Sequence, residues 1–319
     1  MVYICGLIVS RFIMSLNLIV LAKQVPDTHN VTAEAMKADG TVNRGALPAI
    51  FNPEDLNALE MALTIKERYG GSVTVMTMGP PRASDILREA LYRGADHCVL
   101  ITDRAFAGAD TLATSYVLSL AIRKISNYHL VLCGRQAIDG DTAQIGPQVA
   151  EKIGVNQVTY VEKIENLENG EITLSRALGR VTETIRTKLP LLITVTSSAN
   201  RPRCFGAKRL MKYKKARTSF EIKQEIESSS PTGRYGIEIL EEEIAKKHEE
   251  LKNKGLLIET WTAKDLNADP ESIGLTGSPT KVKKVKSIVF AATETKRIEP
   301  TEEGINGLIH ELIEERTFG

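Results

Sequence analysis

The chain has 319 residues, 42% of them hydrophobic, which is enough to bury a sizeable core in one large or two modest domains. Its 41 Lys and Arg residues balance 40 Asp and Glu residues, and a formal net charge of +1 gives no reason to expect nucleic acid or an anionic membrane as main partner. The four cysteines lie far apart, without C-x-x-C pairs or metal-ligand spacing to His. We therefore expect a cytoplasmic protein with buried thiols and no metal site.

The N-terminus carries a short apolar stretch at residues 2–13, which imitates a weak signal peptide. It contains Arg11, lacks a basic start and a small-residue cleavage site, and is followed by a strand-like run directly after Met14. We expect residues 1–15 to be an extra segment, with Met1 or Met14 as the true start. No stretch approaches the roughly 20 apolar residues of a membrane span.

From residue 16 to about residue 154, short β-rich runs alternate with amphipathic helical ones. Strands are predicted over residues 16–22, 72–78, 98–102 and 129–134, and helices over residues 52–70, 83–92 and 110–125. The first helix begins at Asn52-Pro53-Glu54-Asp55, where Asn52 can cap, Pro53 suits the first helical position and the acids favour the positive end of the helix dipole. The alternation predicts a doubly wound α/β fold around a mostly parallel sheet.

The second half of the chain no longer shows the regular alternation of strands and helices. Strands without long helices are predicted over residues 157–162, 171–176, 181–188 and 191–196, as an antiparallel addition to the sheet. Residues 212–236 are polar and rich in Ser, Lys and Glu, which favours a flexible excursion. A charged helix is predicted over residues 237–254, and the tail from residue 258 combines loop-like segments with a closing helix at 303–315.

The best candidate for a nucleotide site is the loop at residues 134–147, because the chain lacks both a G-x-G-x-x-G turn and a P-loop motif. This loop follows an apolar strand, and open α/β sheets bind ligands beyond the carboxyl ends of their strands, where backbone N–H groups meet phosphate. Arg135 offsets the acids Asp139 and Asp141. A plain strand-to-helix turn is the alternative, just as simple helix initiation is the alternative for residues 52–55.

Two local details of the loop are left open by the sequence. Asp141 with Gln144 resembles a capping box, although Gly146-Pro147 is an alternative helix start. Gly140 is expected to serve close backbone approach or a positive φ. No nucleophile–base pair is found and the five His residues share no spacing with one, so no catalytic residue is predicted.

Six features follow one another along the chain: Leu21-Ala-Lys-Gln-Val-Pro-Asp27, Asn52-Pro-Glu-Asp55, Met78-Gly-Pro80, Leu87-Arg-Glu-Ala-Leu-Tyr-Arg-Gly-Ala-Asp96, the loop at residues 134–147, and Glu183-x-Ile185 with Pro190-Leu-Leu-Ile-Thr194. In this order they resemble the β subunits of electron-transfer flavoproteins. The resemblance covers about residues 16–211 and resumes near residue 258.

The resemblance implies a Rossmann-like subunit that is no enzyme by itself and pairs with a larger α subunit carrying redox-active FAD. Electrons enter that flavin from acyl-CoA-type or other flavin dehydrogenases and leave to another acceptor. The β-subunit nucleotide is AMP in ordinary members, and in electron-bifurcating members it is a second FAD, reduced by NADH. Residues 134–144 with Lys23-Gln-Val-Pro-Asp-Thr28 look more like the bifurcating type, which favours FAD.

The resemblance also implies site residues. The adenine nucleotide is held by Leu21, Ala22, Lys23, Asn52, Pro53, Glu54, Asp55, Met78, Gly134, Arg135, Gln136, Ala137, Asp139, Gly140, Asp141, Thr142, Ala143 and Gln144. Arg176 matches a basic residue that family members point toward the partner's flavin. The basic loop at residues 201–211 corresponds to the one that docks dehydrogenases, through Arg203, Lys208, Arg209 and Leu210, with a merely solvated loop as the alternative.

Two departures from the family pattern stand out. The family usually carries acidic and glycine residues before its characteristic Glu, whereas this chain reads Leu178-Gly-Arg-Val-Thr-Glu183, which leaves the local turn open. Residues between Met211 and Ile258 resemble an insertion. We accordingly expect a nucleotide-binding α/β domain at 16–212, a polar insertion with a charged helix at 213–257, and at 258–319 a C-terminal arm and helix contacting the partner subunit. The alternative function is a stand-alone AMP- or ATP-binding regulatory domain of the universal-stress type.

Overall fold

A computed structural model describes residues 15–27, 48–229, 237–280 and 297–314 of the chain. The expected extra segment at residues 1–14, the motif residue Thr28 and the expected helix end at residue 315 lie outside these ranges. No helix within the described ranges combines the length and the apolar character needed to cross a membrane.

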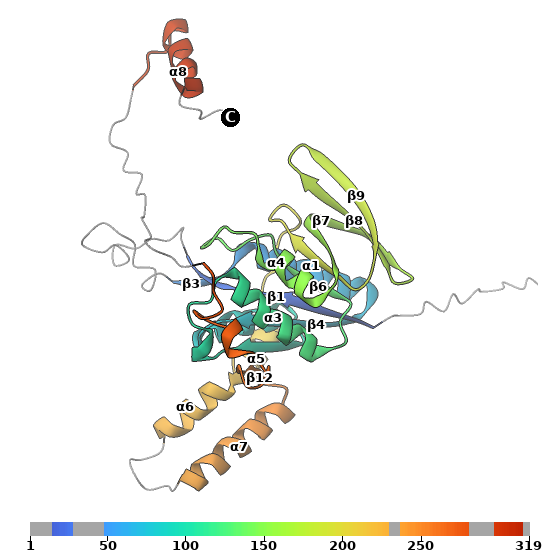
Figure 1. Cartoon of the computed structure of the whole chain (residues 1–319), viewed down its shortest axis with the longest axis vertical. Helices are drawn as coiled ribbons and strands as arrows, with labels where there is room; N and C mark the ends of the chain where they lie inside the picture. The colour runs from blue at the N-terminus through green and yellow to red at the C-terminus, as the bar shows by residue number, and fades with distance from the viewer. Residues whose placement is uncertain (1–14, 28–47, 230–236, 281–296, 315–319) are drawn as a thin grey trace, which may run out of the picture.

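Five parallel strands form the centre of the fold, in the order β5-β4-β1-β6-β10 (Figure 1). They are β1 (Leu16–Leu21), β4 (Gly71–Met78), β5 (His97–Ile101), β6 (Leu130–Gly134) and β10 (Leu191–Val195). From β1 the chain adds β4 and then β5 on one side of β1, and it then crosses to the other side of β1 to form β6. This reversal is that of a doubly wound sheet, so the predicted α/β fold is confirmed.

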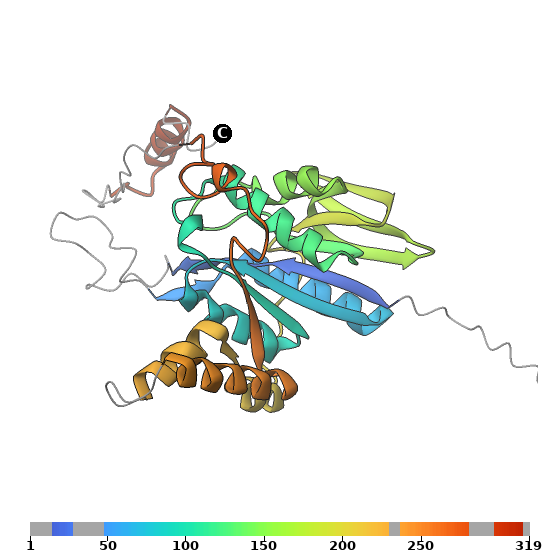
Figure 2. The same cartoon turned by 60° about the horizontal axis from the view of Figure 1, so that its bottom comes forward.

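Helices cover both faces of this sheet (Figure 2). One face packs against α1 (Pro53–Tyr69) and α2 (Ser84–Arg93), and the other against α3 (Thr111–Ile125) and α4 (Ile145–Ile153). Because both faces are covered, the central strands are apolar almost throughout.

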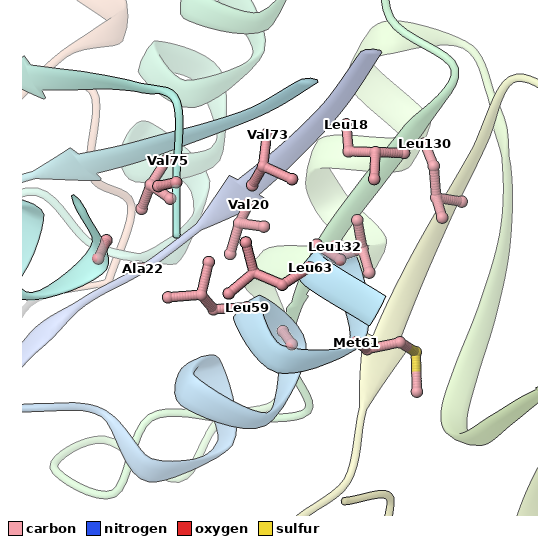
Figure 3. Packing of buried hydrophobic residues seen from close by; sticks show 14 of the residues in the cluster. Leu18, Val20, Ala22, Leu59, Met61, Leu63, Val73, Val75, Leu130 and Leu132 are labelled. Atoms are coloured by element: carbon pink, nitrogen blue, oxygen red, sulfur yellow. The ribbon is translucent and has the colours of Figure 1, made fainter. Parts of the chain in front are cut away.

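Side chains of β1 alternate between the two cores. Leu18 and Val20 pack on the α1 side, where Leu59 and Leu63, one helical turn apart, meet them (Figure 3). Ile19, between them in sequence, belongs to the core on the α3 and α4 side. The central strand is therefore fixed from both faces.

The predicted antiparallel addition is confirmed for three strands and wrong for the fourth. β7 (Asn156–Glu168), β8 (Glu171–Leu178) and β9 (Val181–Lys188) form an antiparallel ribbon. β10 instead lies parallel between β6 and the first half of β7. All five residues of β10 are buried, as a strand covered on both faces requires.

The predicted flexible excursion at residues 212–236 is wrong for most of its length. After α5 (Ala207–Tyr213) come β11 (Arg217–Thr218) and α6 (Ser219–Ser229), and α6 lies beside the predicted charged helix, α7 (Ile237–Asn253) (Figures 1 and 2). Three buried apolar side chains join the pair to the sheet edge: Ile222, Leu251 and Leu256. Because these apolar residues are few in a polar segment, the composition did not indicate that the segment packs against the sheet.

The tail from residue 258 begins as a sheet strand, which the sequence prediction missed. β12 (Leu257–Trp261) pairs in parallel with β5, and β11 pairs with β12, which makes ten strands in the described part of this sheet. Ile258 is fully buried, and Ser278 is 3% exposed. The predicted closing helix is confirmed as α8 (Glu302–Glu314).

The chain also forms a small antiparallel pair, β2 (Gln24–Pro26) with β3 (Ala49–Phe51), and the short 3-10 turns η2 (Pro81–Ala83), η3 (Arg104–Phe106) and η4 (Pro270–Ser272).

Candidate functional site

A cleft of about 940 Å³ lies beyond the carboxyl ends of β1, β4, β5 and β6. It spans the point where β1 and β6, neighbours in the sheet, continue into α1 on one face and α4 on the other. Open α/β sheets bind their ligands at such a switch point. The cleft is therefore the candidate site.

The cleft brings together most of the residues singled out from the sequence. Fourteen of the eighteen expected nucleotide contacts line it: Leu21, Ala22, Lys23, Asp55, Met78, Gly134, Arg135, Gln136, Ala137, Gly140, Asp141, Thr142, Ala143 and Gln144. The other four, Asn52, Pro53, Glu54 and Asp139, do not line it.

Asn52 supports the loop after β6 from behind. Its side-chain amide donates to the carbonyl of Gln136 at 2.9 Å, and its Oδ1 accepts from the backbone N–H of Ile138 at 3.1 Å. The side chain makes no capping hydrogen bond to α1, so its predicted capping role is wrong. Asn52 is fully buried, and these bonds satisfy its amide while fixing the shape of the loop.

Glu54 is the second support of this loop. Its buried carboxylate accepts from the backbone N–H of Gln136 at 3.0 Å and forms an ion pair with Arg135 at 2.9 Å. The Arg135 guanidinium also lies 5.8 Å from the centre of the Tyr160 ring. Arg135, whose positive charge was expected to offset Asp139 and Asp141, is thus paired with Glu54.

Asp55 bridges the gap where β1 and β6 separate. Its carboxylate accepts from the backbone N–H of Lys23 at 2.9 Å and from that of Gly134 at 2.8 Å. Burial raises the pKa of Asp55 to about 7, although the two backbone donors, which favour the charged form, lower it. The segment Asn52-Pro-Glu-Asp55 thus holds both strand ends that form the floor of the cleft.

Gly134 is required by the close approach of α1. A Cβ atom at this position would lie 2.7 Å from Oδ1 of Asp55 and 2.7 Å from the backbone carbon of Glu54. At Gly140 an added Cβ atom would meet nothing within 4 Å and φ is not positive, so neither close backbone approach nor a positive φ calls for glycine there. The left-handed residues of the loop are Asp141 and Ala143.

The capping box proposed for Asp141 and Gln144 is also wrong. Asp141 Oδ1 accepts from the side chain of Gln136 at 2.9 Å, and Gln144 Oε1 accepts from Thr111 at 2.9 Å. α4 starts at Ile145 without a side-chain cap. Gly146 lies inside it, where a Cβ atom would meet Thr194 at 2.6 Å.

One wall of the cleft consists of residues that were not predicted from the sequence. This wall follows β5 and includes Thr102, Asp103, Arg104, Phe106 and the run from Ala107 to Thr111. Asp110 caps α3 through the N–H groups of Leu112 and Ala113 and also accepts from Thr280, so the tail holds the wall in place. The strand-end rule, applied to β5 as it was to β6, would have found this wall.

Among the residues that the structure describes, three cationic side chains line the cleft: Lys23, Arg104 and Arg135. Lys23 pairs with Asp139 at 2.7 Å, and Arg135 pairs with Glu54. Arg104 is exposed and forms no ion pair with any described acid. An anionic ligand would therefore pair with Arg104 without displacing any described acid.

Arg176 lies outside the cleft, on the antiparallel ribbon. It forms an ion pair with Glu183, which stands opposite it on β9, at 2.8 Å. The unusual residues before Glu183 form the turn between β8 and β9, where Gly179 has a φ of 63°. The ribbon carries half-exposed apolar residues at its tip, Leu178 and Val181.

The expected docking loop is partly anchored. Arg203 is tied to Glu60 at 2.8 Å and also pairs with Glu67, both on α1, and these contacts raise the pKa of the Arg203 guanidinium. Lys208 is exposed, whereas Arg209 and Leu210 are half-buried. Docking through these residues stays a prediction, with Lys208 the most accessible of the four.

Comparison with known proteins connects this architecture to one family. The electron transfer flavoprotein domain matches residues 39–224. The chain is 42% identical over 299 residues to the electron transfer flavoprotein subunit beta of Thermoanaerobacterium thermosaccharolyticum, covering 94% of this chain and 95% of that one. It is 41% identical over 269 residues to the protein of the same name from Clostridium acetobutylicum, at 84% and 87% coverage. Caffeyl-CoA reductase-Etf complex subunit CarD of Acetobacterium woodii is 40% identical over 268 residues, at 84% and 86%.

Proposed function

This chain belongs to the electron transfer flavoprotein family, among its beta subunits, and on that basis we propose that it binds an adenine nucleotide in the cleft and works as the smaller subunit of a heterodimer. The observation that carries this proposal is the cleft at the switch point, whose floor is held by Asp55 and whose loop is held by Asn52 and Glu54. Backbone N–H groups and three cations offer contacts to phosphate.

We favour FAD over AMP as the bound nucleotide. A volume of about 940 Å³ lies at the upper end of the range for small-molecule clefts, about 300–1,000 Å³. A dinucleotide uses such a volume better than a mononucleotide. The similarity to CarD, whose name places it in a caffeyl-CoA reductase complex, agrees with the bifurcating type, in which NADH is the electron donor.

The partner we propose is a larger α-type subunit with its own redox-active FAD. α8 supports this, because its apolar residues recur on one side of the helix and are about half exposed: Ile305 at 50%, Ile309 at 46% and Ile313 at 55%. An apolar stripe that the described chain leaves uncovered is suited to a partner surface. Arg176 on the β8–β9 ribbon remains our candidate for the residue that faces the partner's flavin.

For the dehydrogenase that exchanges electrons with the complex, we propose a flavin enzyme acting on CoA thioesters. Two relatives carry names of this kind, CarD and the acryloyl-CoA reductase electron transfer subunit gamma of Anaerotignum propionicum, which is 48% identical over 188 residues. The exposed cation Lys208 would steer its approach.

Co-production with an α-type subunit tests the proposal against the universal-stress alternative. We expect a yellow one-to-one heterodimer in size-exclusion chromatography with light scattering. A stable monomer that binds AMP or ATP at micromolar concentration and ignores the α-type subunit would contradict the proposal and support the stand-alone regulatory domain.

A further inference from the structure

The segment at residues 213–257 contributes one residue to the cleft. Of the cleft-lining residues in the described ranges, Phe220 alone comes from this segment, and its side chain is 49% exposed. It stands in the first turn of α6. An aromatic side chain that lines a cleft and is half exposed offers a flat apolar surface to a bound ligand.

The start of α6 is fixed by a reciprocal capping box. Thr218 Oγ1 accepts from the backbone N–H of Glu221 at 3.2 Å, and Glu221 Oε2 accepts from the backbone N–H of Thr218 at 2.8 Å. Thr218 is fully buried, as is Ile222 at 1% exposure. Phe220 lies between these anchors, so its backbone has little freedom.

The same helix start is tied to the cleft wall. Glu221 forms an ion pair with Arg88 of α2 at 2.9 Å and accepts from Ser84 at 3.3 Å. Ser84 follows three residues after Pro81, which lines the cleft. The contact therefore holds Phe220 in a set position relative to the wall after β4.

Phe220 differs from Phe205, the other exposed phenylalanine among the described residues of this half of the chain. The ring of Phe205, 43% exposed, is already engaged: Tyr92 packs edge-on against it with centroids 5.4 Å apart, and the Arg93 guanidinium lies 4.7 Å from its centre. Phe220 has no such ring or cation contact among the described residues. The described residues therefore leave the Phe220 ring without a stacking partner.

We propose that Phe220 provides a stacking face for a planar ring of the nucleotide bound in the cleft, so that the inserted helix α6 helps set nucleotide affinity. This inference rests on the proposed function and deepens it, because it assigns a ligand contact to the segment for which the family resemblance gave no role. Stacking on an aromatic face accepts either the adenine or the isoalloxazine ring, since both are flat π-systems.

Titration of the heterodimer with FAD and with AMP tests this, using the full chain and a matched set of variants. Phe220→Ala should weaken binding at the cleft about tenfold, the effect of losing a stack of about 1.4 kcal/mol. Phe220→Trp should bind within about twofold of the unchanged protein, because it keeps a flat ring. Phe205→Ala, an equal truncation outside the cleft, should leave affinity unchanged.

The controls separate this inference from the proposed function. Gly134→Ala, which disturbs the cleft floor, should lose nucleotide whatever Phe220 does. If Gly134→Ala loses nucleotide while Phe220→Ala binds as the unchanged protein does, the stacking role is wrong and the proposed function stands. If the heterodimer without any substitution binds neither FAD nor AMP in addition to the partner's flavin, the stacking role and the proposed function are both wrong.

Discussion

At the scale of single residues, the cleft depends on a carboxylate rather than on a glycine-rich turn. Asp55 joins the backbone after β1 to the end of β6, and no side chain longer than hydrogen fits at Gly134 beside it. The two residues depend on each other. Only a glycine at position 134 lets the Asp55 carboxylate come close enough to accept the hydrogen bond from the Gly134 backbone N–H. A change at either position alters the floor of the cleft.

The raised pKa of Asp55 predicts a pH dependence of stability. Its folded pKa of about 7 lies above the ordinary value of 3.8, so the folded chain keeps a proton that the unfolded chain has lost. This contribution is complete below about pH 4 and is lost as the pH rises through 7. Between pH 5 and pH 7, the free energy of unfolding should fall by up to about 1.4 kcal/mol per pH unit on account of this group.

Urea unfolding at pH 5, 6 and 7 would measure this effect, with Asp55→Asn as comparison. The variant should be less stable, by about 1–3 kcal/mol, because one amide oxygen replaces two acceptors. Its stability should nevertheless change less with pH than that of the unchanged chain. Equal slopes for the two proteins would show that Asp55 is ionised in the folded state throughout this range.

At the scale of secondary-structure elements, the same strand-end rule that identified the loop after β6 also applies to β5 and β4. Helix and strand positions in the first half were predictable because apolar periodicity and the residues Pro53 and Gly70 mark their limits. β12 was not, since its five residues follow a polar helix and are buried only through tertiary contacts with β5, β11, α6 and α7. The role of Asn52 was not predictable either. Its position before Pro53 is typical of a helix cap, whereas its actual partners, Gln136 and Ile138, are more than 80 residues away in sequence and come close only in the fold.

The apolar stripe of α8 should decide whether the heterodimer forms. Ile309→Glu places a charge in the middle of that stripe and should weaken association at least tenfold, because an unpaired charge would be buried at the interface. His310→Glu introduces the same residue one position further, on the polar side of the helix, and should associate normally. Sedimentation of the co-produced subunits at several concentrations would compare the two. If both variants associate alike, α8 does not contact the partner.

At the scale of the whole molecule, the described chain is one doubly wound sheet widened on both edges. The antiparallel ribbon β7–β9 extends one side, and β11–β12 with the α6–α7 pair extends the other (Figure 1). The cleft opens between these additions at the carboxyl ends of the central strands. The proposed role of this chain rests on nucleotide binding in that cleft.

The most direct measurement is the nucleotide content of the co-purified heterodimer after acid denaturation and chromatography. We predict two adenine nucleotides per heterodimer, both FAD in the bifurcating type that we favour, or one FAD with one AMP in the ordinary type. Gly134→Ala should lose the nucleotide of this chain, whereas Gly206→Ala, outside the cleft and with no atom closer than 3.6 Å to its added Cβ, should keep it. A single FAD in the unchanged heterodimer, belonging to the partner and unaffected by either substitution, would contradict the claim.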